Sequence, residues 1–258
     1  MAFEWAHRLQ GHHLIAQPSD LALNPPEVYF YVQDFLIISC GIFYALCYTA
    51  YITRTYRDKT LSGTILYMPT CIAYEIYYAY TCTTTTFEKL GFSVWFMMDI
   101  AFCTVAVKCA YPPHKRRITS FLLVFGTIFG LGFYHTVSLY WPDEREQLTA
   151  YWTGTILQLP ISVSAPYLLL KTGSTKGHSI EIWISRYLGV WTAFSLFIWR
   201  YVNVPENWEY VASFWSMAMI VTIIVCETVY PFVYVWVHLK EKRREERNGV
   251  KVNGKKVQ

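Results

Sequence analysis

Long apolar stretches alternate with short polar links along almost the whole chain. A helix needs about 20 mainly apolar residues to cross a bilayer. Unpaired backbone groups are not tolerated in hydrocarbon, so runs of this length predict helices, and the alternation typical of barrel strands is absent. We therefore predict an all-α membrane protein, a seven-transmembrane-helix bundle across 28–239, with spans at 28–52, 64–84, 90–110, 118–140, 149–170, 181–201 and 211–239.

The links between these runs alternate in charge, which predicts how the bundle is oriented. Lysine and arginine collect in cytosolic loops, and here they follow every second run, whereas the opposite links are poor in basic residues and contain acids. The N-terminal segment, 1–27, is therefore predicted to be luminal, and the basic tail, 240–258, cytosolic. The basic residues are Arg54, Arg57, Lys59, Lys115, Arg116, Arg117, Lys171, Lys176, Lys240, Lys242, Arg243, Arg244 and Arg247.

The last four residues, Lys255-Lys256-Val257-Gln258, add a hint about location. They resemble the dilysine signal that returns membrane proteins to the endoplasmic reticulum, and that signal requires a cytosolic C-terminus. Because the charge pattern independently predicts such a tail, we expect a multi-pass protein of the endoplasmic reticulum membrane, surrounded by lipid.

Composition agrees with the membrane assignment and narrows the partners. The chain is 54% hydrophobic and only 16% charged, against roughly 25% charged in an ordinary soluble domain. Its net charge of +4 comes largely from the tail, so a nucleic-acid partner is not implied. All seven cysteines fall within or at the ends of apolar runs, and no CxxC pair occurs, which argues against a disulfide framework or a zinc site.

Three acids lie inside the predicted spans, at Glu75, Asp99 and Glu227. A charge at the centre of a spanning helix costs about 2.5–3.5 kcal/mol, so such a residue tends to face the bundle interior and to have a function. With a rise of about 1.5 Å per residue, all three fall at roughly one depth, near mid-membrane, as does Gln158. We expect a shared polar cavity. The alternative is that each acid is satisfied locally by a serine, a backbone carbonyl or an arginine.

Two further charged residues lie nearer the ends of the runs. Asp34 is close to the non-cytosolic end of the first run, which predicts an interfacial position. Arg186 lies about five residues into the sixth run, so it can extend toward the membrane surface or pair with Glu181 on the same rim. It can equally reach an anionic or carbonyl group of a ligand. The sequence leaves these alternatives open.

Buried acids beside aromatic rings indicate a particular chemistry. Removal of water disfavours the charged form of a carboxyl group, and a protonated acid in a dry site is a proton donor. Helical spacing puts Tyr78 beside Glu75 and Tyr230 beside Glu227, and aromatic faces attract cations. Ordinary packing explains most such rings, but acid and aromatics together suit protonation of an epoxide or olefin followed by carbocation cyclisation. A DDxxD-type cluster, metal-ligand spacing and a glycine-rich phosphate loop are all absent, so we expect no metal or cofactor.

Several motifs together resemble a known family, the small integral-membrane terpene cyclases of fungal meroterpenoid and indole-diterpene (paxilline-type) pathways. The resemblance spans about residues 35–240, and it lies in the order and spacing of the motifs rather than in any single one. The motifs are Met68-Pro69 through Tyr74-Glu75, Gly173-Ser174-Thr175-Lys176-Gly177, Ser185-Arg186-Tyr187-Leu188-Gly189, Arg200, Pro205-Glu206 and Glu227.

This resemblance implies an enzyme of the isomerase or lyase class that cyclises a prenyl chain, usually epoxidised, on an aromatic, polyketide or indole head group. Its substrate would be a hydrophobic prenylated small molecule, supplied by a prenyltransferase and an epoxidase of the same pathway. The family's two acids match Glu75 and Glu227. The pattern has aspartate where this chain has Glu227, and tryptophan where it has Tyr74.

The resemblance and the residues together give one hypothesis for the site. We expect Glu75 to donate the initiating proton and Glu227 to assist or to take part in proton return. Asp99 is expected to tune this pair, and Arg186 to orient the head group. Auxiliary contacts are expected from Tyr78, Tyr230 and Gln158.

Two other classes of protein deserve comparison. A small seven-helix proton-coupled carrier, of the proline-glutamine-loop or sugar-efflux type, would also use buried acids and the prolines Pro69 and Pro160. However, no proline-glutamine dipeptide and no convincing repeat between the two halves is present. A retinal-binding receptor is excluded because the last run, 211–239, contains no lysine for a Schiff base.

Overall fold

The computed structural model describes residues 13–61, 63, 65–83, 85–140 and 148–254, and within them every regular element is a helix. The predicted all-α fold is therefore confirmed. The elements are α2 (Pro18–Ala22), α3 (Glu27–Asp58), a 3₁₀ turn (Ile65–Tyr67), α4 (Met68–Tyr77), a π-helical turn (Tyr78–Cys82), α5 (Thr86–Ala110), α6 (Pro113–Tyr140), α7 (Leu148–Thr172), α8 (Ile180–Asn203), α9 (Pro205–Trp208), a second 3₁₀ turn (Glu209–Ala212) and α10 (Phe214–Gly254).

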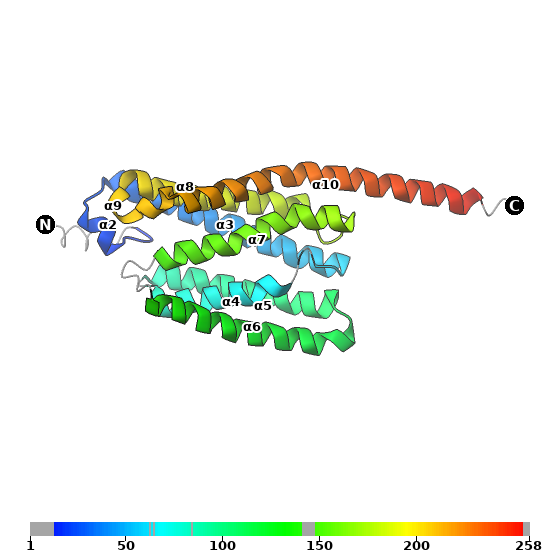
Figure 1. Cartoon of the computed structure of the whole chain (residues 1–258), viewed down its shortest axis with the longest axis horizontal. Coiled ribbons are helices and arrows are strands. Elements are labelled where there is room, and N and C mark those ends of the chain that lie inside the picture. The colour runs from blue at the N-terminus through cyan, green and yellow to red at the C-terminus, as the bar shows by residue number, and fades with distance from the viewer. Residues whose placement is uncertain (1–12, 62, 64, 84, 141–147, 255–258) are drawn as a thin grey trace.

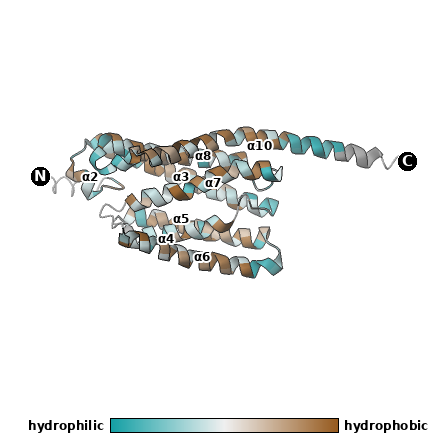
Figure 2. Ribbon diagram, in the orientation of Figure 1, coloured by the Kyte–Doolittle hydropathy of each residue, from teal (hydrophilic) through white to brown (hydrophobic). Residues whose placement is uncertain are grey.

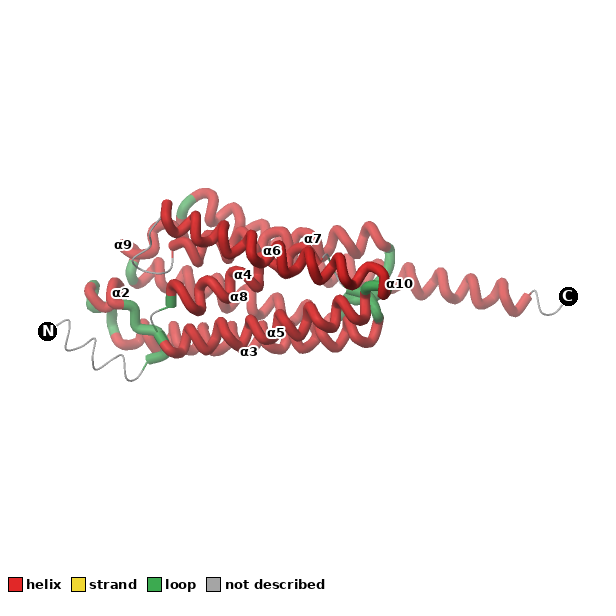
Figure 3. Tube along the Cα trace, turned by 90° about the horizontal axis from the view of Figure 1, so that it is seen from below, coloured by secondary structure: helices red, strands yellow, loops and turns green. Residues whose placement is uncertain are grey.

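The helices form one elongated bundle in which consecutive long helices run in opposite directions (Figure 1). Helices α2 and α9 lie at one end, here called the N-terminal end, and α10 projects beyond the other, here called the tail end (Figure 1). A view turned by 90° shows the same alignment of α3 with α5 (Figure 3). Helix α3 packs against α8 and α5, α7 packs against α10, and α4 packs against α6. The two halves of the bundle are therefore joined chiefly through α3.

Each of the predicted apolar runs is helical in the structure, although the second is not one continuous helix. Pro69 stands in the first turn of α4, and the helix widens into the π turn after Tyr77. Helix α4 alone has 10 residues, fewer than the roughly 20 that a span needs. Within the described residues, five helices are long and apolar enough to cross a membrane, namely α3, α5, α6, α7 and α10.

Hydrophobic residues recur along the long helices of the bundle, whereas the coloured part of α10 that projects beyond it is hydrophilic (Figure 2). Large apolar side chains stand outward on separate helices, with exposed fractions of 67% for Phe35, 71% for Phe129 and 73% for Phe232. Large exposed apolar side chains on several helices favour a non-aqueous neighbour. They suit a lipid environment around the helices.

Two glycines of α6 let α4 approach closely and so determine which way Glu75 faces. A Cβ atom at Gly130 would lie 2.7 Å from the Cβ of Ala73, and one at Gly126 would lie 2.8 Å from the Cβ of Pro69. The face of α4 that carries Pro69 and Ala73 is thus pressed against α6. Glu75 is two residues beyond Ala73, about 200° around the helix, so it points away from α6 into the bundle.

A buried polar cluster organises the N-terminal end. The Asp20 carboxylate, 1% exposed, accepts hydrogen bonds from the hydroxyl of Tyr29 at 2.7 Å, from Asn207 at 2.8 Å and from the indole of Trp208 at 3.1 Å. These contacts tie α2 and α3 to α9. Nearby, Asp34 binds His13 Nδ1 at 2.8 Å, in keeping with the position near the end of α3 that the sequence suggested.

At the tail end, the loop between α7 and α8 is held from two sides. Glu241 of α10 accepts hydrogen bonds from the hydroxyl groups of Ser174, at 2.7 Å, and Thr175, at 2.8 Å. On the other side, Asp58 accepts a hydrogen bond from the backbone N–H of Gly177 at 2.8 Å. Gly177 has a φ of +80°, which glycine adopts readily. This arrangement explains why the loop carries a glycine-bounded motif of small polar residues.

Candidate active site

A cavity of about 330 Å³ lies inside the bundle between α3, α4, α5, α7 and α8. This volume is within the range of small-molecule sites. Its wall reaches from His178 near the tail end to Tyr151 in the N-terminal half. Most of the lining is apolar or aromatic, including Tyr67, Trp95, Phe102, Phe194 and Phe197. Two groups of polar side chains interrupt this wall.

The first polar group consists of Glu75, Asp99 and Tyr48. Both acids line the cavity, and their exposed fractions are 6% for Glu75 and 0% for Asp99. The Tyr48 hydroxyl donates a long hydrogen bond of 3.5 Å to Glu75 Oε1, and the two carboxyl groups are close enough to interact electrostatically. Among the described residues, no donor reaches Glu75 Oε2 or either carboxyl oxygen of Asp99, and no cation pairs with these acids.

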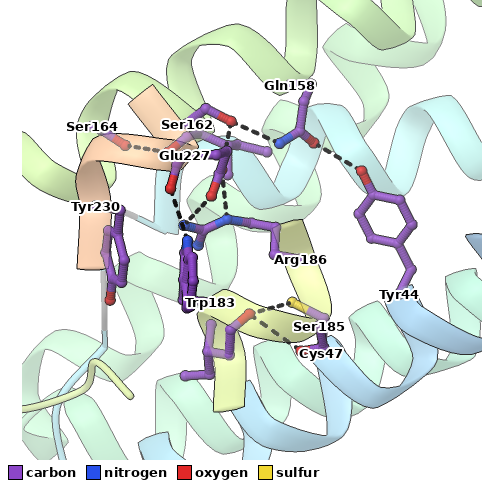
Figure 4. Close-up of polar contacts among 12 residues, drawn as sticks. Tyr44, Cys47, Gln158, Ser162, Ser164, Trp183, Ser185, Arg186, Glu227 and Tyr230 are labelled. Atoms are coloured by element: carbon purple, nitrogen blue, oxygen red, sulfur yellow. Dashed lines mark hydrogen bonds and ion pairs between the residues drawn. The ribbon is translucent and has the colours of Figure 1, made fainter. Parts of the chain in front are cut away.

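The second polar group is centred on Arg186 and Glu227 (Figure 4). The guanidinium donates two hydrogen bonds to the carboxylate, from Nε at 2.7 Å and from Nη2 at 3.0 Å. Ser162 donates a third to Glu227 Oε1 at 2.7 Å. Arg186 lines the cavity, whereas Glu227 lies behind it with 0% exposure. The suggested pairing of Arg186 with Glu181 is therefore wrong, because the guanidinium turns inward to the acid of α10.

Tyrosines of α3 connect the two groups. Tyr51 accepts a hydrogen bond from Arg186 Nη1 at 2.6 Å, and Tyr44 donates one of 3.4 Å to Gln158 Oε1. Tyr44, Tyr48 and Tyr51 are four and three residues apart, so they share one face of the helix. All three line the cavity. Gln158 in turn donates to Ser162 at 3.0 Å, so a chain of hydrogen bonds runs from Tyr44 to Glu227 (Figure 4).

Tyr78 and Tyr230, which the sequence predicted as auxiliary residues of the site, lie at the margins of this cavity. Tyr78 forms a hydrogen bond of 3.1 Å with Thr153 and lines a second cavity rather than the first. Tyr230 lies under the guanidinium of Arg186, 5.3 Å from its ring centroid, and binds His178 Nδ1 at 3.1 Å. Of the three acids expected to share one cavity, Glu75 and Asp99 line it and Glu227 does not.

Several residues of the site were not identified from the sequence. The three tyrosines of α3 could have been found from their i, i+4, i+7 spacing, which places Tyr44, Tyr48 and Tyr51 on one face of a helix. His178 gave no such signal, since it lies in a polar loop. In the structure its ring is buried, and burial, together with the positive charges of Arg186 and Arg54, lowers the pKa of His178 to about 4. The imidazole at this end of the cavity is therefore neutral.

The polar groups at the cavity wall include carboxyls, hydroxyls and one guanidinium. In the part of the chain that the structure describes, no three side chains of histidine, cysteine, aspartate or glutamate gather as metal ligands. The groups that can act on a ligand are the carboxyls of Glu75 and Asp99, the hydroxyls of the α3 tyrosines and the guanidinium of Arg186. All of them face a space that is otherwise apolar and aromatic.

Known proteins similar in sequence to this chain include fungal terpene cyclases. The Pyr4-family terpene cyclase mfmH of Annulohypoxylon moriforme is 29% identical over 238 residues, which cover 90% of this chain and 97% of that protein. The terpene cyclase penB of Penicillium crustosum is 29% identical over 246 residues, covering 90% and 98%. Asnovolin H synthase nvfL of Aspergillus novofumigatus is 28% identical over 178 residues, covering 66% and 72%.

No solved structure matches the chain. The relatives are enzymes, and they give no support to the transporter or receptor alternatives. The model of the Pyr4-like transmembrane terpene cyclases matches residues 19–240, which include both polar groups and the whole cavity. The chain therefore belongs to the Pyr4-like transmembrane terpene cyclase family.

Proposed function

We propose that this cyclase starts its reaction with a proton held by Glu75 and Asp99 together. The observation that carries the proposal is the burial of both carboxyl groups at the wall of an aromatic cavity, with no cation from the described residues beside them. Two buried carboxylates this close together would repel each other with little solvent to screen them, as in other carboxyl dyads. A single proton shared by the pair removes that repulsion and is available to a bound substrate.

The substrate that fits this chemistry is a hydrophobic prenylated small molecule whose chain ends in an epoxide or a double bond. The carboxyl O–H gives its proton to the epoxide oxygen, the C–O bond breaks at the more substituted carbon, and a carbocation forms. The next double bond attacks that carbon and closes a ring, which moves the cation along the chain. Loss of a C–H proton to the carboxylate ends the sequence, so the product is an isomer of the substrate and the enzyme regains its proton.

The walls of the cavity support the cationic stage. The faces of Trp95, Phe194 and Phe197 can stabilise a positive charge that moves past them. Their apolar bulk also keeps water from capturing the cation. We assign no metal or organic cofactor to the reaction, because the carboxyl pair supplies the proton and receives it back.

Glu227 and Arg186 are assigned a supporting role. The carboxylate of Glu227 balances the guanidinium, and Arg186 in turn holds the hydroxyl of Tyr51. Since Tyr48 is one turn away on the same face of α3, the network keeps it against Glu75. Glu227 thus takes part in the proton cycle through the position of other groups, and Gln158, Tyr78 and Tyr230 support the same walls.

We further propose that the chain spans the membrane seven times, with 1–27 on the luminal side, the catalytic bundle at 28–239 and the basic tail, 240–258, in the cytosol. The charge of the links supports this orientation, as does the hydrophilic projection of α10 beyond the apolar bundle (Figure 2). Lys255 and Lys256, which suggest the endoplasmic reticulum, lie outside the described residues. A prenyltransferase and an epoxidase of the same pathway would supply the meroterpenoid or indole-terpenoid substrate.

The test of the acid is direct. Microsomes that contain the wild type, Glu75→Gln or Asp99→Asn are supplied with an epoxyprenylated phenol, and the cyclised product is measured. We expect each variant to lose at least about 100-fold in rate, the usual size of a general-acid contribution. The exposed acid Glu181, at the start of α8, provides the matched control Glu181→Gln. Undiminished product from Glu75→Gln would remove that residue from the mechanism.

A further inference from the structure

A second cavity, of about 210 Å³, lies in the N-terminal half of the bundle. We call it the distal chamber. Its lining includes Tyr78, Thr83, Glu88, Gly91 and Arg200. It adjoins the first cavity, because both are lined by Cys40, Tyr74, Trp95, Ala150, Tyr151 and Phe197. The aromatic members of this shared wall, Tyr74, Trp95, Tyr151 and Phe197, separate the two spaces.

The distal chamber is polar at the end that is far from the acids. Thr83, Glu88 and Arg200 belong to its lining. The carboxylate of Glu88 also accepts a hydrogen bond from the hydroxyl of Thr85 at 2.8 Å, and the hydroxyl of Thr83 donates one to the carbonyl of Ala79 at 2.8 Å. On α5, Glu88 and Asp99 are 11 residues apart, which is about 16 Å along the helix axis. The two cavities together thus have polar groups at both ends and an aromatic region between them.

Arg186 and Arg200 are both held by contacts within the bundle, and Arg200 Nε donates a hydrogen bond to Gln33 Oε1 at 2.8 Å. All three guanidinium nitrogens of Arg186 already donate hydrogen bonds, two to Glu227 and one to Tyr51. On α8, Arg186 and Arg200 are 14 residues apart, or about 21 Å along the axis, so they lie in different cavities. A substrate whose reactive end is at Glu75 and whose other end passes the shared wall therefore approaches Arg200 rather than Arg186.

We propose that the distal chamber binds the oxygen-bearing ring system at the other end of the prenyl chain. This inference rests on the proposed function of Glu75 and Asp99. The terminal epoxide or olefin lies at the acids, the chain folds against Trp95 and Phe197, and the ring system, an aromatic or lactone group with hydroxyl or carbonyl oxygens, lies near Glu88 and Arg200.

Tyr74 determines how the two spaces communicate. Its ring packs against Tyr78 at 4.5 Å and Phe92 at 5.9 Å between centroids, and its hydroxyl donates to the carbonyl of Ala150 at 3.1 Å. Gly154 leaves room for that hydroxyl, since a Cβ there would be 3.1 Å from it. The side chain thus stands between the acid of α4 and the distal chamber. Its size decides how a chain passes from one to the other.

A filling mutation tests the assignment. Gly91 lines the distal chamber, and a Cβ there meets nothing within 4 Å, so Gly91→Leu begins in open space and adds volume to the chamber. Two substrates are compared, an epoxyprenylated phenol and the same epoxyprenyl chain with a methyl group in place of the phenol. We expect kcat/KM to fall at least 20-fold for the phenol and less than threefold for the truncated chain. Val94→Leu, one turn away on an outward-facing position 55% exposed, is the matched control and should change neither.

Equal losses on both substrates, or no loss on either, would overturn the inference. A labelling experiment gives an independent readout. A photoreactive diazirine is placed on the ring system, and Glu75→Gln is used to hold the substrate unreacted. We expect crosslinks in 87–95 or 196–200, whereas crosslinks in 61–67 or 178–186 would contradict the proposed orientation. If the wild type cyclises neither substrate, the proposed function itself fails, and the crosslinks still report which cavity binds the ring system.

Discussion

Arg186 and Glu227 form a double hydrogen bond, of 2.7 and 3.0 Å, between α8 and α10 at a point where Glu227 is fully buried. Such a pair differs from the other acids of the bundle, because its negative charge is balanced and its oxygens are occupied. Among the described residues, Glu75 and Asp99 have no counterion, and of their four carboxyl oxygens Glu75 Oε1 alone accepts a hydrogen bond. The arrangement separates an ion pair from the carboxyl pair that we propose to be reactive, although all three acids lie inside apolar helices.

The first prediction concerns the Arg186–Glu227 pair. Glu227→Gln leaves a buried guanidinium without its counterion, and breaking a buried pair in this way costs about 3–5 kcal/mol. We expect a clear fall in Tm in detergent micelles. The double variant Arg186→Met, Glu227→Leu removes both charges and should recover much of the lost stability. Because it does not restore the hydrogen bond to Tyr51, it should stay poorly active. A double variant as unstable as Glu227→Gln alone would contradict this account.

The second prediction concerns the approach of α4 to α6. Gly130→Ala places a methyl group 2.7 Å from the Cβ of Ala73, which forces α4 and Glu75 to shift. We expect about a tenfold or larger loss in kcat, because small displacements of a catalytic group are costly. Gly132→Ala, where a Cβ meets nothing within 4 Å, is the control. Adding Ala73→Gly to Gly130→Ala should restore activity, and failure of that rescue would argue against the steric explanation.

The third prediction concerns Tyr48, whose hydroxyl approaches Glu75 at 3.5 Å. Tyr48→Phe keeps the ring and removes the hydroxyl that donates to that acid. A hydrogen bond to a group that changes charge contributes about 1.5–3 kcal/mol, so kcat should fall about 10- to 100-fold with little change in KM. Tyr56→Phe, on an exposed part of α3, should have no effect. An unchanged kcat in Tyr48→Phe would show that the hydroxyl takes no part.

The fourth prediction is a pH dependence of stability centred on His178. Its pKa is lowered from 6.5 to about 4 by burial and by nearby arginines. The unfolded chain binds a proton between these values and the folded chain does not, so the free energy of unfolding falls as pH decreases through that window. The contribution of His178 should be about 1–2 kcal/mol between pH 6.5 and pH 5.

The measurement is Tm against pH for the wild type and for His178→Gln. A glutamine side chain can still bind the hydroxyl of Tyr230 but does not titrate, so the variant should lose less stability on acidification. Comparing the two slopes cancels the carboxyl groups that both proteins share. Identical slopes would mean that His178 is not held neutral in the folded chain.

The sequence predicted helical structure along each run and the grouping of Glu75 with Asp99, because both depend on regular spacing along the chain. Run length predicted each helix, and the rise per residue put Glu75 and Asp99 at the depth where they line one cavity. Spacing along the chain does not predict how each helix is rotated about its axis in the bundle. Because of that rotation, Arg186 binds Glu227 rather than Glu181, and Glu227 lies behind the cavity wall.

Other features depend on contacts between distant segments. The second run is divided into a short α4 and a π turn. Pro69 stands in the first turn of α4, and the helix packs on Gly126 and Gly130, which are far from it in sequence. The burial of His178 depends on α10 and α3, which hold its loop from both sides. Periodicity carries no information about such pairings. They become visible only when the helices are assembled.

The central claim is that the pair formed by Glu75 and Asp99 carries a proton at neutral pH. Infrared spectroscopy of the purified protein in lipid tests it most directly, through the carbonyl stretch of a protonated carboxyl group and its shift in deuterated water. We predict a buried protonated-carboxyl band in the wild type that persists in Glu227→Gln and disappears in the double variant Glu75→Gln, Asp99→Asn. A wild-type spectrum without that band, or a band that survives in the double variant, would contradict the account.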